Sequence, residues 1–425
     1  MDINRKTAMK ALLDIEKKGA YSNLSLNENI KKYSPQDQAF VRDLTYGTLR
    51  NKYLLDHFLK TFISKGYNRL KTDVLTLLRM GAYQLIFMDS VPDYAAVSTS
   101  VDFAKKFLRG RESFINGVLR SMARGKADLV WPEKGEDVAD YLSVRYSVNP
   151  WIAEILMDNM GEEGAEAYLK ASNETPELIL RTNLLKGSRE ELIEDLRALG
   201  FTAEPSKVSP RAVKASGTGI LETEVFRSGR FAVQDEASIL ACDVLDPLPG
   251  MTLIDMCAAP GGKTASLGEL MENKGQIFAF DIHEHKVALI EKAARRSGVS
   301  IVKALRADSR ELREDLKETA DRVLCDVPCS GFGVIRRKPE IKYKEPFDIG
   351  ELAETQKRIL SNGASYLKKG GALVYSTCTV DDTENQKVIE SFLEENKGFI
   401  KDKEICMSPA DGTDGFYICR LIREA

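Results

Sequence analysis

The chain has 425 residues, of which 43% are hydrophobic and 29% charged, and its formal net charge at pH 7 is −3. This length and composition predict roughly two or three globular domains with large cores, which excludes a small disulfide-stabilised scaffold. The seven cysteines lack the Cys-x-x-Cys and histidine spacings of zinc sites, so we expect reduced thiols and no metal. The charged amino-terminal stretch and the lack of an uncharged apolar run of about 18 residues predict a soluble cytoplasmic protein without membrane contact.

Residues 1–130 carry apolar side chains at the 3.6-residue spacing of amphipathic helices, as at Ala8, Ala11, Leu12 and Ile15. Glycine and proline signals divide this region into about five to seven segments. We therefore expect an all-helical first domain.

Positive charge is concentrated in the same region. Residues 42–126 contain 15 Lys and Arg against 7 Asp and Glu, an excess of eight positive charges. Such an excess favours a surface that faces nucleic-acid phosphates, although solvated helix faces would give the same count. We interpret the first domain as a source of RNA affinity and not of chemistry.

The pattern changes in residues 131–235, which predict a connector and a small α/β module. A helix entered at Pro150 forms the connector. Ser188 and Gly200 supply the start and stop signals of a helix over residues 188–199. The strands expected in this module are 177–182, 212–214 and 230–233.

Residues 236–425 alternate strands with helices, the pattern of a mostly parallel, doubly wound sheet. The expected strands are 253–255, 276–280, 301–304, 322–325, 372–375 and 416–421. We expect the last two to form an antiparallel hairpin at the sheet edge. Ligands of such sheets bind at the carboxyl ends of the strands.

The first of these strands runs into a loop of small residues, Asp255-Met256-Cys257-Ala258-Ala259-Pro260-Gly261-Gly262-Lys263-Thr264, and then into a helix. Small residues let a ligand approach the backbone, and a helix N-terminus favours an anionic group. The loop is neither Gly-x-Gly-x-x-Gly nor a P-loop, so the carboxylate of S-adenosylmethionine fits as well as a phosphate.

Three more carboxylates follow at the ends of the next three strands: Asp281, Asp308 and Asp326. Asp281 is placed to accept both hydroxyls of a ribose, and Asp308 to meet an adenine amino group. Together with Asp255 they line one edge of the predicted sheet.

Two cysteines also follow predicted strands, Cys329 and Cys378. Carbon C5 of a pyrimidine is a poor nucleophile, and a thiolate that adds to C6 makes C5 able to attack an electrophilic methyl group. The alternative is that both thiols only fill core, because free cysteine is among the most buried residue types.

Three motifs together resemble RNA cytosine-C5 methyltransferases of the Sun/Fmu type. They are Asp-x-Cys-Ala-Ala-Pro-Gly-Gly-Lys-Thr at 255–264, Asp-x-Pro-Cys-Ser-Gly at 326–331 and Ser-Thr-Cys-Thr at 376–379. Residues 78–85 and 114–120 are similar to the NusB-like helical domain of that family, and residues 181–183 and 233–238 to its middle segment. The helical domain marks the 16S ribosomal RNA subgroup.

The resemblance implies three domains. They are an all-α NusB-like RNA-binding domain (1–130), a connector helix with a small α/β RNA-binding module (131–235), and an α/β Rossmann-like domain dependent on S-adenosylmethionine, with a mostly parallel seven-stranded sheet (236–425). The implied reaction transfers the methyl group to C5 of a specific cytosine in 16S rRNA through a covalent adduct between cysteine and C6.

The resemblance also implies residue roles. Cys378 is the nucleophile, and Cys329 assists breakdown of the adduct. From the chemistry of the residues themselves, we expect Asp326, if it is hydrogen-bonded to the N3/N4 edge of the base, to stabilise charge that builds on the ring, and a nearby methylsulfonium and Lys263 to favour the Cys378 thiolate. The residues implied to hold S-adenosylmethionine are Cys257, Ala258, Ala259, Pro260, Gly261, Gly262, Lys263, Asp281, Asp308 and Asp326.

The expected partner is 16S rRNA, either naked or in an early assembly particle, and the protein is expected to be a monomer. We expect Arg336, Arg337 and Lys338 to contact RNA phosphates. Position 338 departs from the histidine expected in many relatives but keeps a positive charge. His283 and His285 are interpreted as exposed residues at a helix start.

Two other classes of function are compatible with parts of the sequence. A non-catalytic NusB-like RNA-binding factor would need only the helical domain, and the thiols and strand-end acids disfavour it. A nicotinamide-dependent oxidoreductase would need the glycine fingerprint that the chain lacks.

Overall fold

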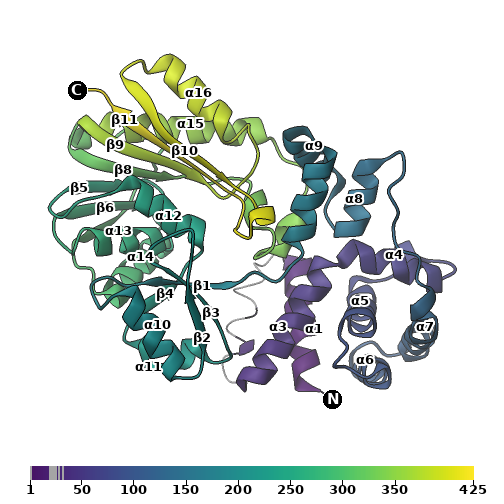
Figure 1. Cartoon of the computed structure of the whole chain (residues 1–425). Coiled ribbons are helices and arrows are strands. Elements are labelled where there is room, and N and C mark those ends of the chain that lie inside the picture. The colour runs from purple at the N-terminus through teal and green to yellow at the C-terminus, as the bar shows by residue number, and fades with distance from the viewer. Residues whose placement is uncertain (1, 19–25, 27–28, 31–32) are drawn as a thin grey trace. The chain divides into compact units, whose positions relative to one another are not determined.

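The computed structural model describes residues 2–18, 26, 29–30 and 33–425 (Figure 1). The chain divides into two compact units. The first contains Met1–Thr175 together with Ile335–Pro346, and the second contains Pro176–Val334 and Phe347–Ala425. A short segment of the carboxyl-terminal half therefore belongs to the amino-terminal unit.

The first unit is helical, as the apolar spacing predicts. Apolar side chains on most sides of α5 make it the central helix, and it packs against α1, α3, α4, α6 and α7. Gly81 permits the close approach to α7, since a Cβ there would lie 2.7 Å from Leu119 Cδ1. The helices are α1 (Ile3–Lys18), α3 (Pro35–Arg50), α4 (Lys52–Phe62), α5 (Thr72–Phe87), α6 (Asp93–Phe107), α7 (Glu112–Gly125), α8 (Val138–Tyr146) and α9 (Pro150–Ser172).

The segment from the carboxyl-terminal half contains a short 3-10 helix, η6 (Pro339–Tyr343), which is fixed inside the first unit by buried polar contacts. The side chain of Lys342 is fully buried, and its Nζ donates to the backbone oxygen of Tyr146 (2.8 Å) and to Asn173 Oδ1. The Trp151 indole donates to the backbone oxygen of Lys344 (2.9 Å). Burial lowers the pKa of Lys342 well below its usual range.

The second unit begins with a small four-stranded antiparallel sheet in the order β2-β3-β1-β4. Its strands are β1 (Leu178–Thr182), β2 (Thr202–Pro205), β3 (Ala212–Ser216) and β4 (Phe231–Val233). Helix α10 (Arg189–Ala198) starts at a capping box between Ser188 and Glu191, and Gly200 follows its end with φ of 85°. Short helix α11 (Glu224–Arg227) precedes β4. Strand β2 was not predicted, because three of its four residues are exposed.

The larger sheet has seven strands in the order β10-β11-β9-β8-β5-β6-β7. Strands β9, β8, β5, β6 and β7 are parallel, and β11 and β10 are antiparallel additions. The predicted mostly parallel seven-stranded sheet is confirmed. The strands are β5 (Thr252–Asp255), β6 (Gln276–Asp281), β7 (Val302–Arg306), β8 (Ala320–Asp326), β9 (Leu367–Thr377), β10 (Phe399–Met407) and β11 (Phe416–Arg423).

Helices cover both faces of this sheet (Figure 1). One core is formed with α15 and α16, through side chains such as Leu360 and Phe392, and another with α12 and α13, through Ala241 and Leu267. The helices are α12 (Glu236–Leu245), α13 (Gly262–Leu270), α14 (Glu284–Ser297), α15 (Ile349–Tyr366) and α16 (Gln386–Glu395). The arrangement is doubly wound.

One detail of the predicted sheet edge is wrong. Strands β9 and β11 do pair antiparallel, but the hairpin is formed by β10 and β11, and β10 is the edge strand. Most side chains of β10 are exposed. The strand therefore lacks the apolar signal by which the others were predicted.

The structure contains neither a membrane-spanning helix nor a metal cluster among the residues it describes. No helix there is long and apolar enough to cross a bilayer. No group of three or more His, Cys, Asp or Glu side chains there could hold a metal ion.

The buried amine of Lys342 gives a test of how the inserted segment is held. Lys342→Met removes a donor from buried oxygens, which should lower the free energy of unfolding by about 1–3 kcal/mol. Urea denaturation monitored by circular dichroism measures this loss. The same change at exposed Lys65 should alter stability by less than about 0.5 kcal/mol. Equal effects of the two variants would contradict the anchoring role.

Candidate active site

The parallel strands bring their carboxyl ends to one edge of the large sheet. Asp255, Asp281 and Asp326 are the last residues of β5, β6 and β8, and Cys378 follows β9 directly. Asp308 lies two residues after β7. The predicted row of strand-end carboxylates is confirmed in its placement.

The loop that follows β5 packs tightly against α14. Gly261 has φ of 100°, and a Cβ there would lie 2.7 Å from Ile290 Cα. Only glycine fits this position without strain. Helix α13 starts at the next residue, Gly262, so its free amino-terminal N–H groups lie at the loop.

Asp255 connects the end of β5 to the first turn of α13. Its carboxylate is 1% exposed, and Oδ2 accepts a hydrogen bond from Thr264 Oγ1 (2.7 Å). Oδ1 has no partner among the described residues. Burial raises the pKa of Asp255 to about 7.

Lys263 and Asp326 form an ion pair at the site, with 3.0 Å between Nζ and Oδ2. Lys263 Nζ also donates to Ser238 Oγ (3.1 Å), and Asp326 Oδ1 accepts from Ser376 Oγ (2.9 Å). Burial opposes the charge on Lys263, but the Asp326 carboxylate outweighs it and holds the pKa of Lys263 above its usual value. Lys263 also interacts electrostatically with Cys378.

The two predicted thiols meet. Cys329 Sγ lies 3.3 Å from Cys378 Sγ, and both side chains are partly exposed, whereas Cys242, Cys325 and Cys419 are buried. The hydrogen bond with Cys378, together with burial, raises the pKa of Cys329 well above its usual range. Partial exposure and mutual contact argue against a role in core filling alone.

The loop that carries Cys329 is held by two residues that the sequence analysis missed. Glu384 Oε2 accepts from the backbone N–H of Ser330 (2.9 Å) and from Gln356 Nε2 (2.7 Å), which also donates to the backbone oxygen of Pro328 (2.9 Å). Both side chains are fully buried, and burial raises the pKa of Glu384. The only signal for this arrangement in the sequence is Gln356, a polar residue among the apolar residues on the buried face of α15.

The remaining predicted acids lie on neighbouring strand ends. Asp281 Oδ1 accepts from the backbone N–H of His283 (2.9 Å). Asp308 pairs with Arg310 (2.6 Å), whose hydrogen bonds lower the pKa of this carboxyl. His283 and His285 are exposed at the start of α14, as expected.

One predicted phosphate contact is wrong. Arg336 is only 6% exposed and belongs to the helical unit, where its backbone oxygen accepts from Arg50 (3.1 Å). Arg337 and Lys338 are half-buried, and their contacts with RNA stay a prediction.

The chain is similar over nearly its whole length to a curated bacterial protein. It is 41% identical over 440 residues to the probable ribosomal RNA small subunit methyltransferase B of Bacillus subtilis, and the match covers 98% of each chain. The chain belongs to the RsmB/F family of 16S rRNA methyltransferases. Family models match three regions: NusB at residues 2–124, the RsmF/B-like ferredoxin-like domain at 149–219, and 16S rRNA methyltransferase RsmB/F at 242–422.

Two solved structures resemble this RsmB/F chain. The crystal structure of PH0851 has a TM-score of 0.83 at 27% identity and covers 100% of both chains. NSun6 from Pyrococcus horikoshii with SFG has a TM-score of 0.59 at 24% identity, covering 64% of this chain and 97% of that one. The latter shares the fold. The predicted family and the NusB-like and methyltransferase domains are confirmed, and the middle module is ferredoxin-like.

The raised pKa of Asp255 predicts a pH dependence of stability. The pKa of Asp255 is about 7 in the folded state and near 3.9 in the unfolded state, so the folded protein binds the proton more tightly. The contribution of Asp255 to the free energy of unfolding is therefore full below about pH 4 and is lost as the pH rises through 7. Asp255→Asn stays neutral throughout. In urea denaturation, the free energy of unfolding of the variant should therefore rise by roughly 2–4 kcal/mol relative to that of the natural protein as the pH is raised from about 4 to 8. Asp411→Asn, at an exposed site, is the control and should show no such gain.

Proposed function

We propose that this chain transfers the methyl group of S-adenosylmethionine to C5 of a specific cytosine in 16S rRNA, through a covalent adduct between Cys378 and C6. The 3.3 Å contact between the two thiols, beside the Lys263–Asp326 pair, carries the proposal. Both thiols lie at the sheet edge where doubly wound proteins bind their ligands. The names of the family and of the curated relative support rRNA as the substrate.

S-adenosylmethionine suits the residues at the same edge. The loop of residues 257–263 exposes a helix N-terminus for a carboxylate, and the Asp281 carboxylate is partly exposed at the tip of β6 for the ribose hydroxyls. Asp308 is proposed to meet the adenine amino group and Asp326 to complete the site. The bound cofactor supplies an electrophilic methyl group. The relative whose structure carries SFG supports this class of cofactor.

Cys378 and Cys329 are proposed to have different roles in the reaction. The Cys378 thiolate, favoured by Lys263, forms a bond from Sγ to C6 while the C5–C6 π electrons make C5 nucleophilic. As negative charge builds on the ring, N3 takes up a proton from solvent, and the Asp326 carboxylate stabilises this form of the base by accepting hydrogen bonds from its N3–H and N4–H groups. After C5 has gained its methyl group it loses its proton to a base, and the Sγ–C6 electrons return to Cys378 as the C5–C6 double bond reforms. Cys329, whose Sγ lies 3.3 Å from that of Cys378, assists this release.

The helical domain of residues 1–130 is proposed to supply RNA affinity. Its excess of positive charge in residues 42–126 and its match to the NusB family support this assignment. The substrate is proposed to be naked 16S rRNA or an early assembly particle, and the protein to act as a monomer. A non-catalytic RNA-binding factor would leave the contact between the two thiols without a role.

The two thiols should give opposite results in one experiment. Cys378→Ser should abolish turnover and adduct, because a serine hydroxyl without an activating base is a far weaker nucleophile. Cys329→Ala should attack and methylate but release slowly, which leaves protein crosslinked to RNA. A denaturing gel of each variant with 16S rRNA and S-adenosylmethionine measures this difference.

The double variant is the control, since it should lose the slow-migrating band that Cys329→Ala gives. A trapped band from Cys378→Ser and none from Cys329→Ala would reverse the two roles. No methyl transfer by the natural protein to any form of 16S rRNA would refute the proposed reaction.

Asp281 offers a separate test of the cofactor site. Asp281→Ala should weaken S-adenosylmethionine binding by about 1.5–3 kcal/mol, the contribution of a charge-assisted hydrogen bond, and leave RNA binding intact. Isothermal titration calorimetry measures the first and a filter-binding assay the second. Glu291→Ala, at an exposed position of α14, is the control. Unchanged cofactor affinity in Asp281→Ala would remove this residue from the site.

A further inference from the structure

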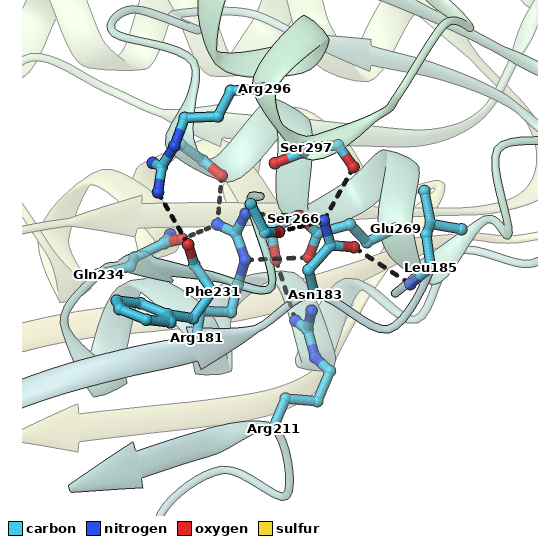
Figure 2. Close-up of polar contacts among 12 residues, drawn as sticks. Arg181, Asn183, Leu185, Arg211, Phe231, Gln234, Ser266, Glu269, Arg296 and Ser297 are labelled. Carbon is cyan, nitrogen blue, oxygen red and sulfur yellow. Dashed lines mark hydrogen bonds and ion pairs between the residues drawn. The ribbon is translucent and has the colours of Figure 1, made fainter. Parts of the chain in front are cut away.

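A buried arginine of the small antiparallel sheet, labelled Arg181 in Figure 2, contacts Glu269 of α13. It also contacts the backbone of the proposed cofactor loop. Arg181, on β1, is 1% exposed and forms a two-bonded ion pair with Glu269 of α13, at 2.7 Å from Nη2 and 3.1 Å from Nε. Its Nη1 donates to the backbone oxygen of Gly262 (2.7 Å) and to the Gln234 side chain. One guanidinium therefore holds both ends of α13.

Stability alone does not account for this pair. Removing two charges from water costs free energy that their attraction barely offsets, so an apolar pair of similar size often serves as well. Unlike an apolar side chain, a guanidinium makes directional hydrogen bonds, and its planar set of N–H donors fixes the orientation of the groups it binds. The groups fixed here are the side chain of Glu269 and the backbone at Gly262.

Three consecutive residues at the start of α13 are each held by a different partner. Gly262 is bound by Arg181, Lys263 by Asp326, and Thr264 by Asp255. The last two partners lie on strands of the large sheet, and only Arg181 belongs to the small one. The position of Gly262 thus depends on the small sheet being packed against α13.

A second arginine makes a similar link without reaching the loop. Arg211, just before β3, is 4% exposed; its Nε bonds Asp243 of α12 (2.7 Å) and its Nη2 bonds Ser266 of α13 (3.0 Å). Figure 2 shows this contact to Ser266, one turn beyond Gly262. Arg211 therefore also connects the small sheet to the helices that pack on the large sheet, through a comparable ion pair. It serves as a matched control for Arg181.

We infer that Arg181 is a positioning residue for cofactor binding: by fixing the Gly262 carbonyl and Glu269, it sets the conformation in which residues 257–263 receive the cofactor. The inference rests on the proposed role of this loop in binding S-adenosylmethionine. It assigns to the small sheet a part in cofactor affinity, in addition to its proposed RNA contacts.

The test compares Arg181→Lys, Arg181→Met and Arg211→Met. Arg181→Lys keeps a cation opposite Glu269, so it preserves folding, but it loses the fork that reaches Gly262. Both Arg181 variants should raise the Kd and the KM for S-adenosylmethionine about tenfold, with kcat changed less than about threefold and RNA affinity unchanged. Arg211→Met should lower the melting temperature but keep the cofactor Kd within about twofold of the natural protein.

Hydrogen exchange of the loop peptide without cofactor provides a readout that is independent of catalysis. Residues 257–263 should exchange faster in Arg181→Lys than in Arg211→Met. Unchanged cofactor Kd and loop exchange in Arg181→Lys would overturn the inference, as would an equal loss of affinity in Arg211→Met. If the natural protein itself bound no S-adenosylmethionine, the proposed function would fail, and the inference with it, whatever the loop exchange.

Discussion

The parallel alignment of β9, β8, β5, β6 and β7 is the constraint on which the rest of the site depends. Because these strands run in one direction, all their carboxyl ends reach the same edge. Cys329 and Cys378, 49 residues apart in the chain, meet there at 3.3 Å, and Lys263 pairs with Asp326 from a different crossover. An antiparallel arrangement of β8 and β9 would send the two thiols to opposite edges.

Buried polar contacts then fix the loops that leave these strands. Thr264 donates a hydrogen bond to Asp255, and Arg181 donates one to the backbone of Gly262. Gln356 and Glu384 hold the loop that carries Cys329. Each buries polar or charged atoms at a cost in desolvation, which only well-directed partners offset. Such contacts preorganise a site, because the groups that face the ligand need not reorient when it binds.

The segment Ile335–Pro346 connects the loop that carries Cys329 to the helical unit through the chain itself. It starts six residues after Cys329, and the buried amine of Lys342 anchors it among α8 and α9. The helical unit therefore includes a piece of the carboxyl-terminal half of the chain.

The sequence by itself determined the features that depend on local pattern. Strand periodicity, the glycines of the loop at 257–263, and acids or thiols directly after apolar runs predicted the sheet, the row of Asp255, Asp281 and Asp326, and the two cysteines. Exposed strands such as β10 carry no such pattern and were missed. Only the tertiary structure revealed that Glu384 holds the Cys329 loop, that Arg336 is buried, and that Arg181 reaches Glu269 across 88 residues of chain. Those contacts join residues far apart in sequence, and their partners are set by how sheets and helices pack, which no local spacing encodes.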